Sequence, residues 1–187
     1  PTPGVTFDQV RESAALVRDY LAELGMLGFP KTTGSKGIHI YVRIEPGWDS
    51  FAIRCDGIDL GRELSERHPE LIADKWGKEE RGERVFVDFN QNAPHKNMFG
   101  AWGARPRVGA QVSTPFGWDE LESIDPETCT IDTVPHRLAS LGVPWELMDD
   151  APCSIVPPVA RFAADLSDGI PDAPRPLQYP KLTTDTH

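Results

Sequence analysis

The residues best suited to chemistry in this chain are a short polar run, residues 32–39, and a single carboxylate further along, Asp88. The run reads TTGSKGIH and combines two glycines, hydroxyl side chains, a lysine and a histidine. A turn of this composition can present backbone amides, hydroxyl donors and one cation to a single polyanion such as a triphosphate. Asp88 lies inside the apolar stretch VFVDF, and a carboxylate is a ligand for a hard divalent cation. The two features together indicate metal-dependent nucleotide chemistry.

Each polar group of the run has its own expected part in holding an anion. The Ser35 hydroxyl and the amides of Gly34 and Gly37 are expected to donate to phosphate oxygens. Lys36 would neutralise charge, and His39 would add a donor from the strand that follows. We therefore read the run as a phosphate cradle.

Other uses of these residues fit the sequence less well. A hydrolase triad of Ser35, His39 and Asp88 is disfavoured, because a nucleophile elbow needs G-x-S-x-G and Thr33 stands at the first glycine. The chain has neither the G-K-[ST] of a P-loop nor the G-x-G-x-x-G of a dinucleotide site. One aspartate is also too few for a two-metal site, and residues 1–90 contain no D-x-D.

Two helices are predicted around the run. TFDQ at residues 6–9 is a capping box, and apolar residues recur every three or four positions from Val10 to Leu24, so a helix should end near Gly25. A second helix is expected over residues 50–67, before a proline.

Three extended segments complete this part of the chain. Residues 27–32 form a short extended piece before the Gly-Ser-Lys-Gly turn. Residues 38–44 alternate isoleucine or valine with polar residues, which predicts a strand with His39 on the polar face. A charged loop over 75–84 leads to a third extended piece, residues 85–89, in which Asp88 faces away from Val87.

The order helix, strand, helix, strand indicates an α+β fold, most of an RNA-recognition-motif-like unit that lacks its first strand. We expect residues 1–116 to form the catalytic portion. Residues 117–187 are acidic and proline-rich, and we expect them to form a wrapping extension of the same domain with short helices over 133–141 and 159–166. The residues from about 171 onward should be extended or disordered.

Composition fits one domain of a cytoplasmic protein. The 187 residues are 39% hydrophobic, no apolar run is long enough for a bilayer, and no signal peptide is recognisable. Three scattered cysteines argue against a disulfide scaffold or a zinc site and fit a reducing compartment. The net charge of −10 disfavours nucleic acid, but residues 31–116 carry a net charge of +1 and residues 117–187 a net charge of −9. The first residue is not methionine, which suggests a start inside a longer polypeptide.

Several motifs in this order resemble the polymerase domain of bacterial ligase D and its stand-alone actinobacterial primase-polymerase relatives. These proteins belong to the archaeo-eukaryotic primase superfamily and act in bacterial non-homologous end joining. The resemblance covers about residues 1–150, and YPK at 179–181 resembles the C-terminal end of the family. The motifs that carry it are TGSKGIH at 33–39, KEERG at 78–82, VFVDFNQN at 85–92, Lys96, RPR at 105–107 and VSTP at 112–115.

The resemblance implies site residues. Asp88 would be a metal ligand and, with His39, a catalytic residue. Gln91 would lie near the sugar or base of the incoming nucleotide. The residues that would contact the nucleotide are Thr33, Ser35, Lys36, His39, Gln91, Arg105 and, more weakly, Lys96.

The chain departs from the family pattern in two places. Trp102-Gly103 stands where the family usually has Tyr-Ser, which removes a serine contact. The family's first motif, a strand bearing D-x-D before a proline, is not found, and Pro1 would correspond to that proline. We therefore expect residues 1–187 to be inactive by themselves.

The resemblance also implies an activity. The parent protein would transfer nucleotides from NTP or dNTP to a 3′-OH with two Mn²⁺ or Mg²⁺ ions, on DNA with gaps or broken ends. Ku and a DNA ligase are expected partners, and no membrane is involved. The alternative is a catalytically inactive module that binds nucleotides or nucleic acid.

Overall fold

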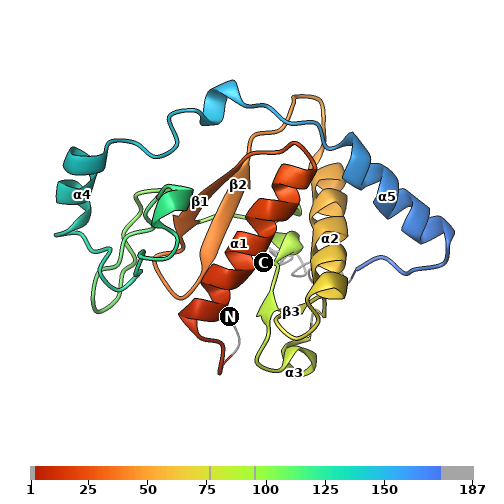
Figure 1. Ribbon diagram of the computed structural model, residues 1–187, viewed down its shortest axis with the longest axis horizontal. Coiled ribbons are helices and arrows are strands. Elements are labelled where there is room, and N and C mark those ends of the chain that lie inside the picture. Colours follow the sequence, from red (N-terminus) through yellow and green to blue (C-terminus); the bar gives the residue numbers. More distant parts are fainter. Residues whose placement is uncertain (1–2, 76, 95, 174–187) are drawn as a thin grey trace, which may run out of the picture.

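The computed structural model describes residues 3–75, 77–94 and 96–173. It is a mixed α+β structure in which two long helices lie side by side in front of the strands (Figure 1). This agrees with the predicted fold class. The elements are α1 (Phe7–Glu23), β1 (Gly28–Thr32), β2 (Ile38–Val42), α2 (Ser50–Arg67), β3 (Ile72–Ala73), α3 (Lys78–Arg81), β4 (Val85–Phe86), η1 (Phe89–Asn92), η2 (Trp118–Glu120), α4 (Val134–Leu141), η3 (Met148–Asp150) and α5 (Val156–Ser167).

Helix α1 begins and ends where its local sequence predicts. The Thr6 hydroxyl accepts from the Gln9 amide at 3.2 Å, and the Gln9 side chain accepts from the Thr6 amide at 2.9 Å. This capping box satisfies two amide groups that the first turn would leave unpaired. Past the C-terminus, Gly25 adopts a φ of +71°, a conformation that glycine reaches without steric cost. The predicted first helix is confirmed.

Helix α2 spans the predicted residues 50–67. The Asp49 carboxylate caps it by accepting from the Ala52 amide at 2.8 Å. Gly57 faces the chain that follows β4, and a Cβ at Gly57 would lie 3.0 Å from the Cβ of Phe89. A glycine inside a helix costs about 1 kcal/mol relative to alanine. Here it lets a neighbouring segment approach the helix closely.

Strands β1 and β2 form an antiparallel hairpin whose loop is residues 33–37. The register pairs Lys31 with His39 and Pro30 with Ile40, so the first pair shares one face of the hairpin and the second pair the other. The Ile40 side packs on the core that α1 and α2 form, as the alternation predicted. The polar run therefore becomes a strand-to-strand turn with fixed ends.

Strands β3 and β4 make a second, parallel pair of two residues each. The prediction of an extended segment over 85–89 was too long, because the strand ends at Phe86 and Phe89 begins a 3₁₀ turn. The predicted alternation fails there as well. The rings of Phe86 and Phe89 meet edge to face at 5.5 Å between centroids, although they were expected on opposite faces. Asp88 causes the turn by accepting from the Asn90 amide at 3.1 Å.

Buried apolar side chains form three clusters in the described residues. The largest lies between α1, α2 and the strands, and a smaller one joins α2, Phe89 and α5. The third links Ala14 of α1 to the chain between Val112 and Val134, so part of the acidic extension is packed against the first helix. Helices α4 and α5 confirm the two short helices predicted there. The division at residue 116 stays a prediction.

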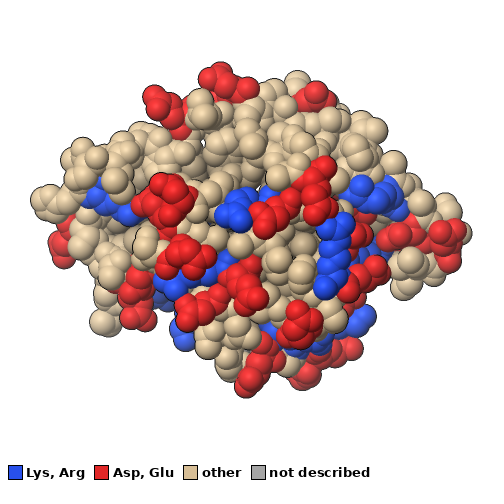
Figure 2. Space-filling view, viewed as in Figure 1, with Lys and Arg blue, Asp and Glu red and all other residues tan. Residues whose placement is uncertain are grey.

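Several other expectations can be compared with the structure. The three cysteines are free and buried, in accordance with the predicted lack of a disulfide scaffold. None of the described helices is long and apolar enough to cross a bilayer. Acidic and basic side chains are interspersed over the face in Figure 2. The expectations for Pro1, for residues 179–181 and for an extended or disordered chain beyond residue 173 lie outside the described residues.

Candidate functional site

The hairpin loop, residues 33–37, is closed by bonds between its own ends. The Thr33 amide donates to the Gly37 carbonyl at 2.9 Å, and the Gly37 amide donates to Thr33 Oγ1 at 3.2 Å. The expectation that the Gly37 amide donates to a phosphate is therefore corrected, because the Thr33 hydroxyl already accepts from it. At Gly34, φ is +65°, and a Cβ would lie 3.0 Å from Arg105 Cγ. Only glycine fits this position without a shift of its neighbours.

Two arginines from a distant segment hold the loop. The Arg105 guanidinium donates twice to the Thr33 carbonyl, at 3.1 and 2.9 Å, and lies 3.7 Å from the ring centroid of Phe99. Arg107 donates to Ser35 Oγ at 3.1 Å and to the Gly34 carbonyl at 2.9 Å. Hydrogen bonds from charged groups contribute about 1.5–3 kcal/mol each. The loop is thus fixed and brought next to two cations.

Arg107 is a site residue that the sequence reasoning did not select. It belongs to the same RPR triplet as Arg105, so its motif was the available signal. The contact with Ser35 came from folding, since 72 residues separate the two side chains. The Ser35 hydroxyl, expected as a free donor, accepts from Arg107 and keeps its own proton for a ligand.

Lys36 and His39 differ sharply in their surroundings. Lys36 is exposed at the tip of the loop and makes no side-chain hydrogen bond or ion pair with the described residues. The His39 ring is largely buried, and its Nδ1 has no hydrogen-bond partner in the described part of the chain. Burial, and then the positive charges of Lys31 and Arg105, lower the pKa of His39 from 6.5 to about 4. His39 is therefore neutral at pH 7.

The carboxylate of Asp88 is exposed and held mainly by its own turn. One oxygen accepts from the Asn90 amide at 3.1 Å, and the other accepts from the Gln91 side-chain amide at 3.0 Å. The turn itself is anchored to α2. Asn90 is fully buried, and its side-chain oxygen accepts from Arg54 Nε at 3.0 Å. Arg54 and Asn90 are supporting residues that the sequence reasoning missed, because a buried arginine carries no local signal.

A cavity of about 550 Å³ separates β2 from the segment that carries Asp88, with α1 and α2 along its other sides. His39, Asp88 and Gln91 line the same cavity. Asp56 of α2 lines it too and was not selected. Burial, and then the charge of Asp59, raise the pKa of Asp56 to about 6.

The remaining predicted residues lie around the hairpin loop or apart from it. Thr33, Ser35 and Arg105 are joined by the bonds of the loop, and Lys36 is at its tip. Lys96 follows η1, is exposed, and has no side-chain bond to any described residue. The predicted site residues thus fall into two groups, the loop residues with Arg105, and the cavity-lining His39, Asp88 and Gln91.

The described residues provide part of what a divalent cation site needs. The Asp88 carboxylate is exposed on the cavity and is a hard oxygen donor, the type that Mg²⁺ and Mn²⁺ prefer. Over residues 3–75, 77–94 and 96–173, however, no three carboxylate, histidine or cysteine side chains converge on one point. Asp88 can thus supply one ligand, and a complete two-metal site needs further ones.

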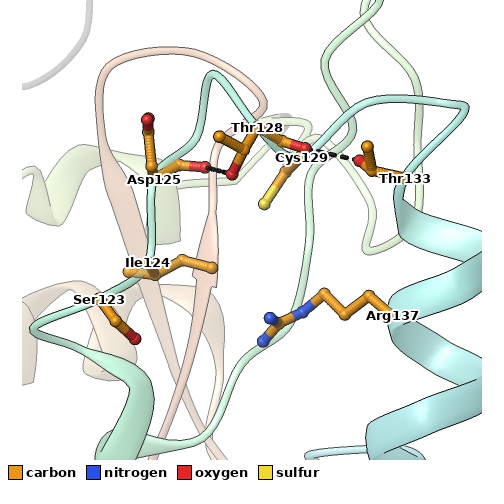
Figure 3. Close-up of a pocket in the computed structure, with 7 residues that line it drawn as sticks. All are labelled: Ser123, Ile124, Asp125, Thr128, Cys129, Thr133 and Arg137. Atoms are coloured by element: carbon orange, nitrogen blue, oxygen red, sulfur yellow. Dashed lines mark hydrogen bonds between the residues drawn. The ribbon is translucent and has the colours of Figure 1, made fainter.

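A second cavity, of about 260 Å³, is lined by residues between Ser123 and Arg137 and shares no lining residue with the first (Figure 3). Its two charged residues already have partners, since Arg137 is paired with Glu120 and Asp125 accepts from the Glu127 amide at 2.8 Å. Its hydroxyl groups bond to neighbouring backbone, as when Thr133 Oγ1 donates to the Thr128 carbonyl at 2.5 Å. Burial raises the pKa of the Cys129 thiol, which makes it a poor nucleophile at neutral pH. We assign no role to this cavity.

Comparisons with known proteins place the chain in a family. A family model described as the primase-polymerase domain of LigD matches residues 1–145. The multifunctional non-homologous end joining DNA repair protein LigD of Mycobacterium tuberculosis is 33% identical over 153 residues, which are 81% of this chain and 20% of that protein. The LigD protein of Mycolicibacterium smegmatis is 30% identical over 182 residues, 97% of this chain and 24% of the relative.

A solved structure agrees with these matches. The polymerase domain of Mycobacterium tuberculosis ligase D, in complex with DNA, superposes with a TM-score of 0.73 at 34% identity. The match covers 81% of this chain and 53% of that domain. The chain thus spans about a fifth to a quarter of its curated relatives and about half of the solved domain. Sequence motifs, family model and fold agree, and the chain belongs to the family of LigD primase-polymerase domains.

Proposed function

We propose that this chain forms the nucleotide-binding part of a DNA repair polymerase that transfers nucleotides to a 3′-OH. The observation that carries the proposal is that His39 and Asp88 line one cavity, while the hairpin loop that leads into the strand of His39 carries cationic and hydroxyl groups. A triphosphate is bound by cationic and hydroxyl groups, and the divalent cation that accompanies it is bound by a carboxylate. Membership of the LigD polymerase family supports the same assignment.

The cradle would bind the triphosphate through charge and hydrogen bonds. Lys36 at the loop tip is a cation without an ion-pair partner among the described residues, and the Ser35 hydroxyl keeps a proton to donate. Arg105 fixes the Thr33 carbonyl and so holds the loop in one conformation. His39 is neutral, so it would act as a hydrogen-bond donor or acceptor and not as a charge. Fixed donors of this kind orient the phosphates without reorganisation when the ligand arrives.

Asp88 would hold a divalent cation, and Gln91 would fix its orientation through the bond at 3.0 Å. When bound, two Mn²⁺ or Mg²⁺ ions supply charge neutralisation at the pyrophosphate and activation of the 3′-OH. Gln91 also lines the cavity, which supports a role near the sugar or base of the nucleotide. We propose that the substrate is an NTP or a dNTP and that the acceptor is DNA with gaps or broken ends. Ku and a DNA ligase remain proposed partners.

We further propose that residues 1–187 alone do not extend a primer. Asp88 is the one metal ligand that we propose, no metal-ligand cluster is found among the described residues, and two-metal transfer needs more than one carboxylate. Such a chain would bind nucleotide without transferring it, which is the behaviour of the alternative, inactive module.

Primer extension on gapped DNA with Mn²⁺ tests both statements. The 187-residue chain should give no product, and a longer protein that extends over the whole length of the solved relative should give product. Incorporation by residues 1–187 alone would contradict the second proposal. A longer protein that binds triphosphate with Mn²⁺ but never transfers it would contradict the first and favour the binding module.

A further inference from the structure

Lys31 has an unusual setting directly before the cradle. It lies in β1, two residues before Thr33, and its side chain is fully buried. Its ammonium donates to Ser113 Oγ, and the Ser113 hydroxyl donates to the Thr32 carbonyl at 2.7 Å. Lys31 is therefore held in one position behind the loop.

The charge of Lys31 has no opposite charge beside it. Its neighbours that carry charge or titrate are His39 and Tyr41 of β2, and Arg105, one of the two arginines that hold the loop. The Tyr41 ring centroid lies 5.8 Å from the ammonium, and no ion pair joins Lys31 to any residue in the described ranges. Burial, and then the charge of Arg105, lower the pKa of Lys31 to about 8. The ammonium is thus charged at pH 7 in surroundings that disfavour its charge.

A purely structural role explains this arrangement poorly. A hydrogen bond to Ser113 needs only a donor, which a neutral side chain could provide without the free-energy cost of burying a charge. Lys31 is the cross-strand partner of His39, so both side chains lie on one face of the hairpin, and His39 is also among the residues that line the cavity. The group of Lys31, His39 and Arg105 is positive overall and has no carboxylate among its charge neighbours. Such a group suits a bound polyanion.

We infer that Lys31 is an electrostatic positioning residue for the triphosphate, acting from behind the loop and without touching the ligand. This inference rests on the proposed function of the cradle. The bound phosphates would supply the negative charge that the buried ammonium lacks. Because that charge favours the protonated amine, binding near pH 8 should be accompanied by uptake of about half a proton.

Isothermal titration of the 187-residue chain with ATP, without added metal, tests the inference. The titration is run at pH 8 in two buffers of different ionisation enthalpy, so the difference in heat gives the number of protons taken up. The phosphate pKa of the ligand is about 6, so ATP itself is ionised at this pH. Wild-type protein should take up about half a proton, and Lys31→Gln should take up none and bind at least about tenfold more weakly.

Two control variants separate charge from structure. Ser113→Ala removes the hydrogen bond but keeps the ammonium, so proton uptake should persist. Lys36→Gln removes the exposed cation, so affinity should fall while proton uptake persists. ATP binding by wild-type protein without proton uptake would overturn the inference and leave the cradle intact, and this result needs no variant to fold. If wild-type protein does not bind ATP at all, the cradle is wrong and the inference fails with it.

Discussion

The two parts of the candidate site are built in different ways. The cation side is a hairpin loop whose carbonyl and hydroxyl groups accept from Arg105 and Arg107, residues that lie 72 or 73 positions away in the chain. The acid side is a short turn in which Asp88 bonds only to its near neighbours, Asn90 and Gln91. That turn is attached to α2 through Arg54 and the close approach at Gly57.

Because of this difference, we expect that substitutions can alter each side separately. His39 and Asp88 line the same cavity. Within the described residues, however, no hydrogen bond joins Asp88 to His39 or to the loop. Substitutions on the cation side should therefore change the binding of the triphosphate, and substitutions on the acid side should change transfer. The predictions below test that separation.

Loss of the acid side should have the largest effect on activity. In a longer protein that includes the rest of the polymerase domain, Asp88→Asn should reduce nucleotide incorporation by at least about 1,000-fold, because a metal ligand is lost. Triphosphate binding without metal should stay within about twofold of wild type. Primer extension and isothermal titration measure the two quantities. The control is Asp132→Asn, an exposed carboxylate far along the chain. Near-normal turnover of the Asp88 variant would remove Asp88 from the mechanism.

On the cation side, Gly34→Ala should weaken triphosphate binding about thirtyfold. The φ of +65° costs an alanine about 1–2 kcal/mol, and its Cβ would lie 3.0 Å from Arg105 Cγ and 3.2 Å from the Ser113 amide nitrogen. Gly25→Ala is the matched control, since φ there is +71° but no atom lies within 4 Å of the new Cβ. Equal effects of both substitutions on binding would show that the contact with Arg105 does not shape the cradle.

The pH dependence of folding should expose His39. Folding lowers its pKa from 6.5 to about 4, so the unfolded chain binds more protons between these two pH values. The free energy of unfolding should therefore fall as pH drops from about 6.5 to about 4, with a contribution of about 2 kcal/mol from this residue. Urea unfolding at several pH values measures it, and His39→Gln should lose that contribution. A variant with the same pH dependence as wild type would contradict the buried, neutral histidine.

Lys36→Ala should have the smallest of these effects, a loss of about tenfold in triphosphate affinity with little change in maximal turnover of the longer protein. The side chain is exposed, and solvent weakens its attraction for the ligand. Lys96→Ala serves as the comparison, because Lys96 is also exposed and makes no side-chain bond to the loop in the described part of the chain. Titration with ATP should show a smaller loss for Lys96. The reverse order would mean that the loop tip does not face the ligand.

Local sequence signals predicted the elements, and long-range contacts limited the prediction of the site. The capping box at Thr6 and the apolar periodicity placed α1 and α2 well, since both depend on residues within a turn or two. The strand that begins at Val85 was predicted to be too long, because the alternation of apolar and polar residues does not show that Asp88 caps a turn. Arg54, Arg107 and Lys31 were missed as site residues for one reason. Their roles come from partners 36 to 82 positions away.

The central claim is that the cradle and Asp88 face one bound nucleotide, and paramagnetic NMR tests it most directly. Isotope-labelled protein is titrated with ATP and then with Mn²⁺, which broadens signals from amides close to the ion. We predict that the amides of residues 33–37 and of residues 88–91 broaden together, and only when ATP is present. Broadening of one group without the other, or of neither, would contradict a shared site.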